Sequence, residues 1–218
     1  MAITERHIGS SVRHGLCAIA LAAMTTTAPA DSKALDAALP QVDLAPLSIE
    51  PRPVGEFELR DHTGRTFDLQ RLEGHWNLLL FGFTHCPDIC PLHLTILNKA
   101  WDRLQSAGYG AEAMPQVILV SVDPERDTLQ RLGEYVRFFN EDFLGVTGEA
   151  SQIAALEDDL QAGHRAFSPD VQGNYNVMHT SSIYLIDPNG QAVAQFRPPF
   201  RSQQLAGAYH MIRGGGTQ

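Results

Sequence analysis

Apolar residues follow two different spacings along this chain, and each spacing predicts a type of element. Short apolar runs or strict alternation predict β-strands, whereas apolar residues three or four positions apart predict helices that bury one face. The strands are expected at residues 57–59, 67–69, 77–83, 117–122, 183–186 and 192–196. The helices are expected at residues 92–104, 129–139, 151–162 and 203–212. Strands that alternate with helices are typical of an α/β sandwich.

The order of these elements predicts a thioredoxin-like α/β fold with an extra β-hairpin at its N-terminal end. The hairpin joins residues 57–59 to residues 67–69 through His62-Thr63-Gly64. Residues 31–52 are rich in Ala, Pro and Asp and show no sustained period, so they are expected to be a linker. We therefore expect one folded domain over residues 53–218.

The first 30 residues have the three parts of a secretory signal peptide. Two arginines give a positive start, residues 15–24 are an apolar run, and Ala28-Pro29-Ala30 matches a cleavage site. A short membrane anchor is the alternative, but the uncharged stretch is shorter than the ~20 apolar residues that a spanning helix needs. Cleavage after Ala30 gives an exported protein and removes Cys17 with the signal.

Charge and composition exclude some classes of function. The 218 residues include 25 acidic and 16 basic side chains, which gives a net charge of −9. A protein that binds nucleic acid needs a basic surplus to neutralise phosphates, so nucleic acid is excluded as a partner. The hydrophobic fraction of 44% is ordinary for a globular protein, and the chain is long enough to bury a substantial core.

Two cysteines remain after the predicted cleavage, Cys86 and Cys90, within the sequence FGFTHCPDICP. They lie where the strand at 77–83 ends and a helix begins near Asp88. Free backbone N–H groups and the helix dipole favour negative charge at such a junction, so a lowered thiol pKa is expected. Residues i and i+4 face the same way on a helical turn, so both sulfur atoms can approach one metal ion or form a disulfide.

Three interpretations of this pair follow: a structural disulfide, a redox pair, or a set of metal ligands. A disulfide that closes so short a loop removes little chain entropy and stabilises little, which favours a reactive pair. Thiolates are soft ligands that favour Cu(I), with zinc as a competitor. A site with two thiolates usually gains a third ligand, so the histidines are the next candidates.

His179 is the best candidate for the third ligand. It lies just before the strand at 183–186, and in a thioredoxin-like sheet that segment packs beside the cysteine helix. An imidazole beside two thiolates completes a site for Cu(I) or Cu(II). His93 lies on the cysteine helix and can also approach the site, whereas Met178 is a softer donor that is expected to point away. Asp123 either hydrogen-bonds near the site or caps the turn that follows it.

Three segments resemble the Sco/SenC family, the copper-binding assembly factors of cytochrome c oxidase. They are FGFTHCPDICP at 81–91, SVDPERDT at 121–128 and VMHTSSIYLIDPNG at 177–190. The resemblance implies a thioredoxin fold, copper ligation by Cys86, Cys90 and His179, and delivery of copper to the binuclear copper site of the oxidase. Two departures from the family pattern, Met178 and Leu129, touch no expected ligand and concern partner recognition.

Several functions stay open at this point. A copper metallochaperone would act on the copper-site subunit of the oxidase and would meet other periplasmic copper chaperones or thioredoxin-like reductases. A thiol-disulfide reductase would use Cys86 as nucleophile and Cys90 as resolving thiol to keep the oxidase cysteines reduced. A peroxidase is third, because only Thr84 matches part of a peroxidatic site. His179 separates the first two, since only a copper site needs it. The expected location is the periplasm, either free or anchored to the inner membrane.

Overall fold

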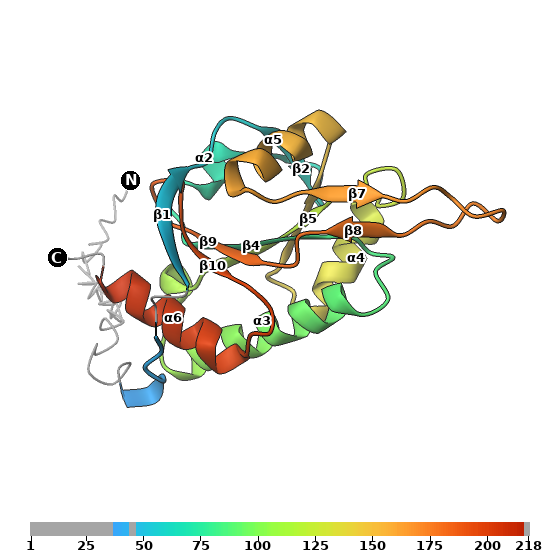
Figure 1. Ribbon diagram of the computed structural model, residues 1–218. Helices are drawn as coiled ribbons and strands as arrows, with labels where there is room; N and C mark the ends of the chain where they lie inside the picture. The colour runs from blue at the N-terminus through green and yellow to red at the C-terminus, as the bar shows by residue number, and fades with distance from the viewer. Residues whose placement is uncertain (1–36, 44–46, 216–218) are drawn as a thin grey trace, which may run out of the picture.

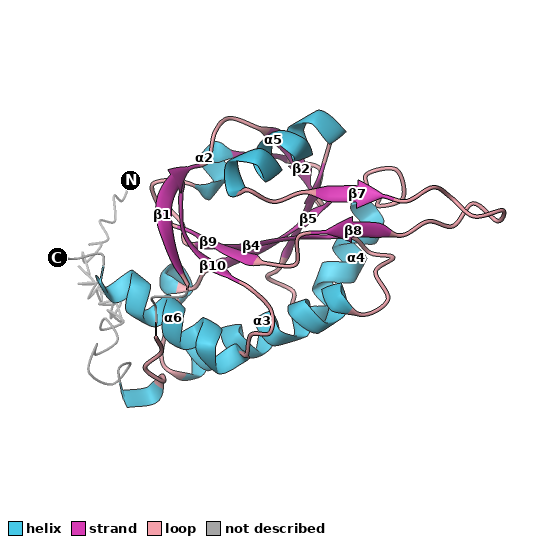
Figure 2. Ribbon diagram, viewed as in Figure 1, coloured by secondary structure: helices cyan, strands magenta, loops and turns pink. Residues whose placement is uncertain are grey.

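The computed structural model describes residues 37–43 and 47–215, which form a central β-sheet with helices on both faces (Figures 1 and 2). Among the described residues, eight strands form one sheet in the order β1-β10-β9-β4-β5-β6-β2-β3. These strands are β1 Ser48–Pro53, β2 Glu58–Asp61, β3 Thr66–Asp68, β4 Asn77–Gly82, β5 Gln116–Ser121, β6 Leu144–Thr147, β9 Ile183–Ile186 and β10 Gln191–Phe196. Strands β7 His164–Ala166 and β8 Val177–His179 pair only with each other, in an antiparallel ribbon.

The helices divide between the two faces of the sheet. They are α2 Leu69–Leu72, α3 Ile89–Ser106, α4 Leu129–Phe139, α5 Ala150–Leu160 and α6 Ser202–Gly215, with a short 3₁₀ turn η1 at Ala111–Ala113. Helices α3, α4 and α6 cover one face, where Leu94, Leu132 and Leu205 belong to one buried cluster (Figure 1). Helices α2 and α5 cover the other face, where Leu72 and Leu156 are buried. Two covered faces require central strands that are apolar throughout.

Strand β4 lies at the centre of the sheet, parallel to β5 on one side and antiparallel to β9 on the other. Its six residues are all buried, which agrees with the continuous apolar run seen in the sequence. Helix α3 follows β4, and the carboxyl ends of the parallel strands β4 and β5 meet at the same edge of the sheet. This arrangement confirms the thioredoxin-like α/β fold, and it places the cysteine segment at that edge.

The predicted N-terminal hairpin is confirmed, because β2 pairs with β3 in antiparallel register from Glu58↔Asp68 to Arg60↔Thr66. Its second strand ends one residue earlier than predicted. The Asp68 side chain accepts a hydrogen bond from Arg71 N and thereby caps α2, which begins at Leu69. A capping aspartate favours the start of a helix over continuation of a strand.

The predicted linker at 31–52 is wrong for its last residues, because β1 at Ser48–Pro53 is an edge strand that pairs with β10. Two prolines within β1 hid this strand from sequence analysis, although prolines are tolerated at a sheet edge. The predicted signal peptide at 1–30 lies outside the described residues. Within the part of the chain that the structure describes, no helix has both the length and the apolar character needed to cross a membrane.

Candidate metal centre

The cysteine segment lies between the end of β4 and the start of α3. Cys86 is in the connecting loop, where its N–H donates to Phe83 O at 3.3 Å, and Cys90 is the second residue of α3. Pro91 is in the first turn of the helix, where no partner for a backbone N–H is needed. The predicted helix start near Asp88 is therefore confirmed, and both sulfur atoms lie at the N-terminal end of α3.

The two cysteines have different environments. Cys86 is half-buried, whereas Cys90 is only 1% exposed. A hydrogen bond from the Cys90 thiol, followed by backbone N–H groups at the helix start, lowers the pKa of Cys86 to about 5 despite partial burial. The same hydrogen bond, together with burial, raises the pKa of Cys90. The loop cysteine is therefore the thiolate and the helix cysteine the thiol of the metal-free pair.

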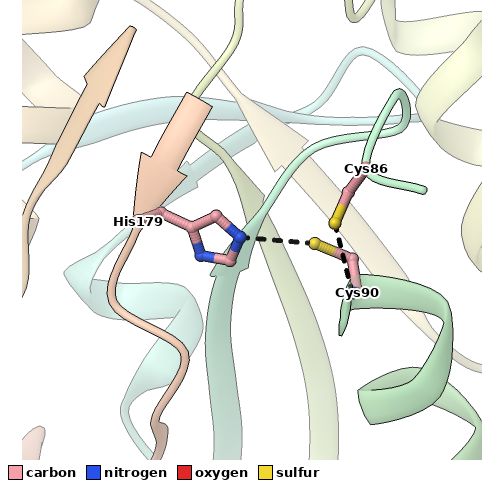
Figure 3. A group of neighbouring side chains, drawn as sticks. All are labelled: Cys86, Cys90 and His179. Carbon is pink, nitrogen blue, oxygen red and sulfur yellow. Dashed lines mark hydrogen bonds between the residues drawn. The ribbon is translucent and has the colours of Figure 1, made fainter. Parts of the chain in front are cut away.

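His179 is the last residue of β8, and its ring points toward the cysteines (Figure 3). Nε2 lies 3.5 Å from Cys90 Sγ, and Nδ1 lies 3.1 Å from Thr180 O. Because a carbonyl oxygen only accepts, the proton of neutral His179 lies on Nδ1 and the lone pair of Nε2 faces the sulfur atoms. The Phe83 ring meets the imidazole edge-on, with ring centroids 5.8 Å apart, and restricts its rotation.

These three side chains form a set of ligands that fits a thiophilic metal ion. One ligand atom each from Cys86, Cys90 and His179 lies within 4.8 Å of the other two. Two sulfur donors and one imidazole nitrogen suit Cu(I) and zinc, and the nitrogen also suits Cu(II). The structure therefore brings together all three predicted site residues from positions far apart in the sequence.

The site opens to solvent through a shallow pocket. Cys86 and His179 are part of its lining, together with the apolar side chains of Phe83, Ile89 and Val177. Cys90 is not part of the lining and lies behind Cys86. A metal ion held here is reached from the side of Cys86 and His179.

His93 does not join the three ligands, whereas Met178 lines the same pocket as Cys86 and His179. His93 is 4% exposed and its ring lies 4.7 Å from the Phe200 ring, in the packing between α3 and the segment before α6. Burial, with a smaller contribution from His179, lowers the pKa of His93 to about 4, so it is a neutral core residue. Met178 is 55% exposed, pairs with Arg165 across the ribbon and lines the same pocket as Cys86 and His179, so its expected orientation away from the site stays a prediction.

Asp123 acts on the ribbon and not on the sulfur atoms. Its carboxylate accepts hydrogen bonds from Arg126 Nε at 2.6 Å and from Tyr175 Oη at 2.7 Å. Arg126 also donates to Tyr175 O, and its guanidinium lies 3.6 Å from the centre of the Tyr175 ring. Asp123 therefore fixes the segment that leads into β8, which agrees with the first of its two predicted roles, a hydrogen bond near the site.

Asp127 is a structural element of the site that sequence analysis missed. Its carboxylate is 1% exposed and accepts from Thr84 N at 2.9 Å, Thr84 Oγ1 at 2.6 Å and Ser121 Oγ at 2.6 Å. It ties the loop before Cys86 to the end of β5. Asp123, Asp127 and His85 also lie within 4.8 Å of one another, but both carboxylates are already occupied by protein donors. The sequence feature that could have indicated this role of Asp127 is the position of its two hydroxyl partners, Ser121 and Thr84, at the ends of neighbouring parallel strands.

Comparison with known proteins identifies the family. The model of the family SCO1/SenC matches residues 47–212. A protein of Stutzerimonas stutzeri that is named for copper binding is 31% identical over 198 residues, which cover 90% of this chain and 92% of the relative. The mitochondrial SCO2 homologue of Bos taurus is 40% identical over 136 residues, which cover 62% of this chain and half of the relative.

Solved structures agree with this assignment. The crystal structure of ScoI from Arabidopsis thaliana, determined with copper bound, superposes with a TM-score of 0.66 at 32% identity and covers 73% of this chain and 98% of the other. The family match extends over residues 47–212 and therefore includes Cys86, Cys90 and His179. This chain belongs to the SCO1/SenC family.

Proposed function

We propose that this chain is an exported copper chaperone that holds copper on Cys86, Cys90 and His179. Its client is the binuclear copper site of a respiratory cytochrome c oxidase. The observation that carries the proposal is the convergence of two sulfur atoms and one imidazole nitrogen within 4.8 Å of one another, with Nε2 of His179 facing Cys90 Sγ. Membership of the family, and a related structure determined with copper bound, support copper over zinc as the cargo.

The geometry also supports release of the ion. Two thiolates and one Cu(I) ion carry a net charge of one negative unit. The low-dielectric surroundings of Cys90 disfavour this charge, whereas solvent near the half-buried Cys86 stabilises it. A ligand from the client reaches copper through the pocket on the side of Cys86 and His179. Copper then passes to the client by exchange of ligands, with no net oxidation or reduction of the protein.

A second candidate function is thiol-disulfide reduction, and the unequal exposure of the two cysteines favours it. Cys86 is accessible and Cys90 lies directly behind it, with Cys90 N only 3.4 Å from Cys86 Sγ. The Cys86 thiolate would attack a client disulfide and release one client thiolate. Cys90 would then attack the mixed disulfide, release the second client thiol and leave a Cys86–Cys90 disulfide. Two electrons pass to the client, and an exported thioredoxin-like reductase would restore the pair.

Replacement of His179 separates the two functions. His179→Ala should weaken Cu(II) binding strongly and Cu(I) binding less, because Cu(I) accepts two thiolates whereas Cu(II) prefers a nitrogen donor and higher coordination. The variant should still reduce a disulfide substrate, since both cysteines are intact. Oxidase copper content in cells, measured beside disulfide reduction in vitro, gives the comparison, with His75→Ala at an exposed turn as the control.

Loss of oxidase copper in the His179→Ala strain, with disulfide reduction retained, supports the chaperone. Normal oxidase assembly with His179→Ala, but failed assembly with Cys86→Ser, would favour the reductase instead.

We further propose that residues 1–30 are removed during export, so that the mature chain begins at Asp31. Mass spectrometry of the protein from the periplasmic fraction should give the mass of residues 31–218. Recovery of residues 1–30 in a membrane fraction would instead establish a retained anchor.

A further inference from the structure

The ribbon that carries His179 has few attachments to the rest of the fold. Strands β7 and β8 are separate from the eight-stranded sheet of the described residues, and their connecting loop projects from the body of the molecule (Figure 1). Val177 anchors β8 in the core, and Tyr175 binds Asp123 and Arg126 just before it. These contacts fix one end of β8, and His179 lies at the other end.

A hydrogen-bonded pair of side chains, His164 and the buried Glu157, holds β7 at the level of His179. The His164 Nδ1 atom lies 2.9 Å from Oε1 and 2.8 Å from Oε2 of Glu157 on α5. The Glu157 side chain is 5% exposed and the His164 side chain 24%. Burial raises the pKa of Glu157, and the hydrogen bond from His164 opposes this effect. A carboxylate is rarely buried to this degree unless it has a partner.

The register of the ribbon places this pair directly beside the metal ligand. His164 is the cross-strand partner of His179. Thr180 N donates to Gly163 O at 2.9 Å, and Phe167 N donates to Asn176 O, so by alternation His164 and His179 form a non-hydrogen-bonded pair. In such pairs the Cβ atoms lie on the same face, roughly 5 Å apart. A shift of His164 is therefore transmitted to His179.

We propose that Glu157 is a positioning residue for the metal centre, which acts through His164 and β7 to keep Nε2 of His179 directed at the two sulfur atoms. This inference rests on the proposed copper site. Glu157 does not touch the ligands. Glu157 anchors β7, which pairs with the strand of His179, to helix α5. Helix α5 packs on the face of the sheet opposite to α3.

Substitutions of Glu157 separate positioning from general stability. Glu157→Leu removes the anchor and places an apolar side chain among Ile153, Leu156 and Leu160. Removal of one partner destabilises a protein when the other partner is left buried, but the His164 side chain is 24% exposed and can bind water, so the melting temperature should change little. Glu157→Gln keeps an acceptor for His164 Nδ1–H and should behave like the natural protein. Asp158→Asn removes the same charge from the exposed neighbouring position on α5 and is the matched control.

Two measurements report on His179 in these variants. The first is Cu(II) titration of the reduced full chain, with nitrogen hyperfine coupling in the EPR spectrum as the signature of the imidazole. Glu157→Leu should weaken Cu(II) binding about 10- to 100-fold, the usual effect of losing a group that orients a ligand. The second is amide hydrogen exchange of Thr180 in the metal-free protein, which should be about tenfold faster in Glu157→Leu.

Both effects in Glu157→Leu, with Glu157→Gln and Asp158→Asn unchanged, support the proposal. An unchanged Cu(II) spectrum and unchanged Thr180 exchange in Glu157→Leu would overturn it and leave the proposed function intact. If the natural protein itself showed no nitrogen ligand, the copper site and this inference would fail together. Should Glu157→Leu not fold, His164→Ala in the partly exposed strand gives the same comparison.

Discussion

The chemical difference between Cys86 and Cys90 arises from one helical turn. Cys86 precedes α3, and its Sγ atom accepts a hydrogen bond from Cys90 N–H. Cys90, by contrast, is buried in the core. The sequence predicted a lowered thiol pKa from the position of the pair at a helix start. It could not assign that effect to one cysteine, because the assignment depends on which sulfur atom is buried, and burial is set by the strands that pack under α3.

The first prediction concerns the charge on Cys86. In the reduced, metal-free protein, thiolate absorbance should show one titration near pH 5, where the lowered pKa of Cys86 lies, against an ordinary value of 9.0. A group with a lowered folded pKa stabilises the fold fully above its unfolded pKa, and this contribution is lost as the pH falls toward the folded value. Stability of the reduced protein should therefore fall between pH 9.0 and about 5.

Cys86→Ser is the control for this titration and should show neither the absorbance change nor this part of the pH dependence. A first thiolate titration near pH 9.0 in the natural protein would contradict the assignment.

Gly82 tests how closely the end of β4 approaches the metal centre. A Cβ atom at this position would lie 3.0 Å from Cys90 Sγ and 2.9 Å from Leu119 Cδ1. Gly82→Ala should therefore destabilise the fold by about 1–3 kcal/mol, the usual effect of overpacking, and should weaken copper binding through displacement of Cys90. Urea unfolding and copper titration measure the two effects.

Gly110→Ala is the matched control, because a Cβ atom there meets nothing within 4 Å. Equal stability and copper affinity for the two alanine variants would show that Gly82 is not in close contact with the site.

At the scale of elements, strong periodicity was predicted well, and the short strands β2, β3 and β9 were also predicted, whereas β6, β7 and β8 were not. Strands β4 and β5 have continuous apolar runs because both of their faces are buried, and helices α3 and α4 have a long apolar stripe because each buries one face. Strand β6, by contrast, has four residues, and β7 and β8 have three residues each. Their formation depends on pairing with segments distant in sequence, which a local pattern does not contain.

The loop that precedes α3 supplies a prediction about Asp127. Asp127→Ala leaves Thr84 N–H and the hydroxyls of Thr84 and Ser121 without their acceptor. Each buried polar group without a partner costs about 1–3 kcal/mol, so the variant should lose at least ~2 kcal/mol of stability. The loop should also loosen, and alkylation of Cys86 should change in rate. Chemical unfolding and alkylation kinetics measure both.

Asp102→Ala at an exposed position of α3 is the control for the loss of a carboxylate. A stable Asp127→Ala variant with an unchanged alkylation rate would show that the loop holds its shape without this carboxylate.

On the scale of the whole molecule, the metal centre joins two parts of the chain that are 89 residues apart. Residue types and spacing were enough to propose Cys86 and Cys90 as a pair. They were not enough to place His179 beside them, which required the order of strands in a thioredoxin-like sheet and the resemblance to a family. The anchoring of the ribbon by Glu157 and His164 could not be foreseen, because neither residue has a local pattern that marks it.

The most direct test of the account is the copper content of the purified, reduced protein and of its ligand variants. The natural protein should bind one copper ion per chain, with sulfur and nitrogen donors in its X-ray absorption spectrum. Cys86→Ser and Cys90→Ser should each abolish tight binding, because either change leaves one thiolate for the ion. Full copper stoichiometry and affinity in either serine variant would contradict the assignment of the metal centre to Cys86, Cys90 and His179.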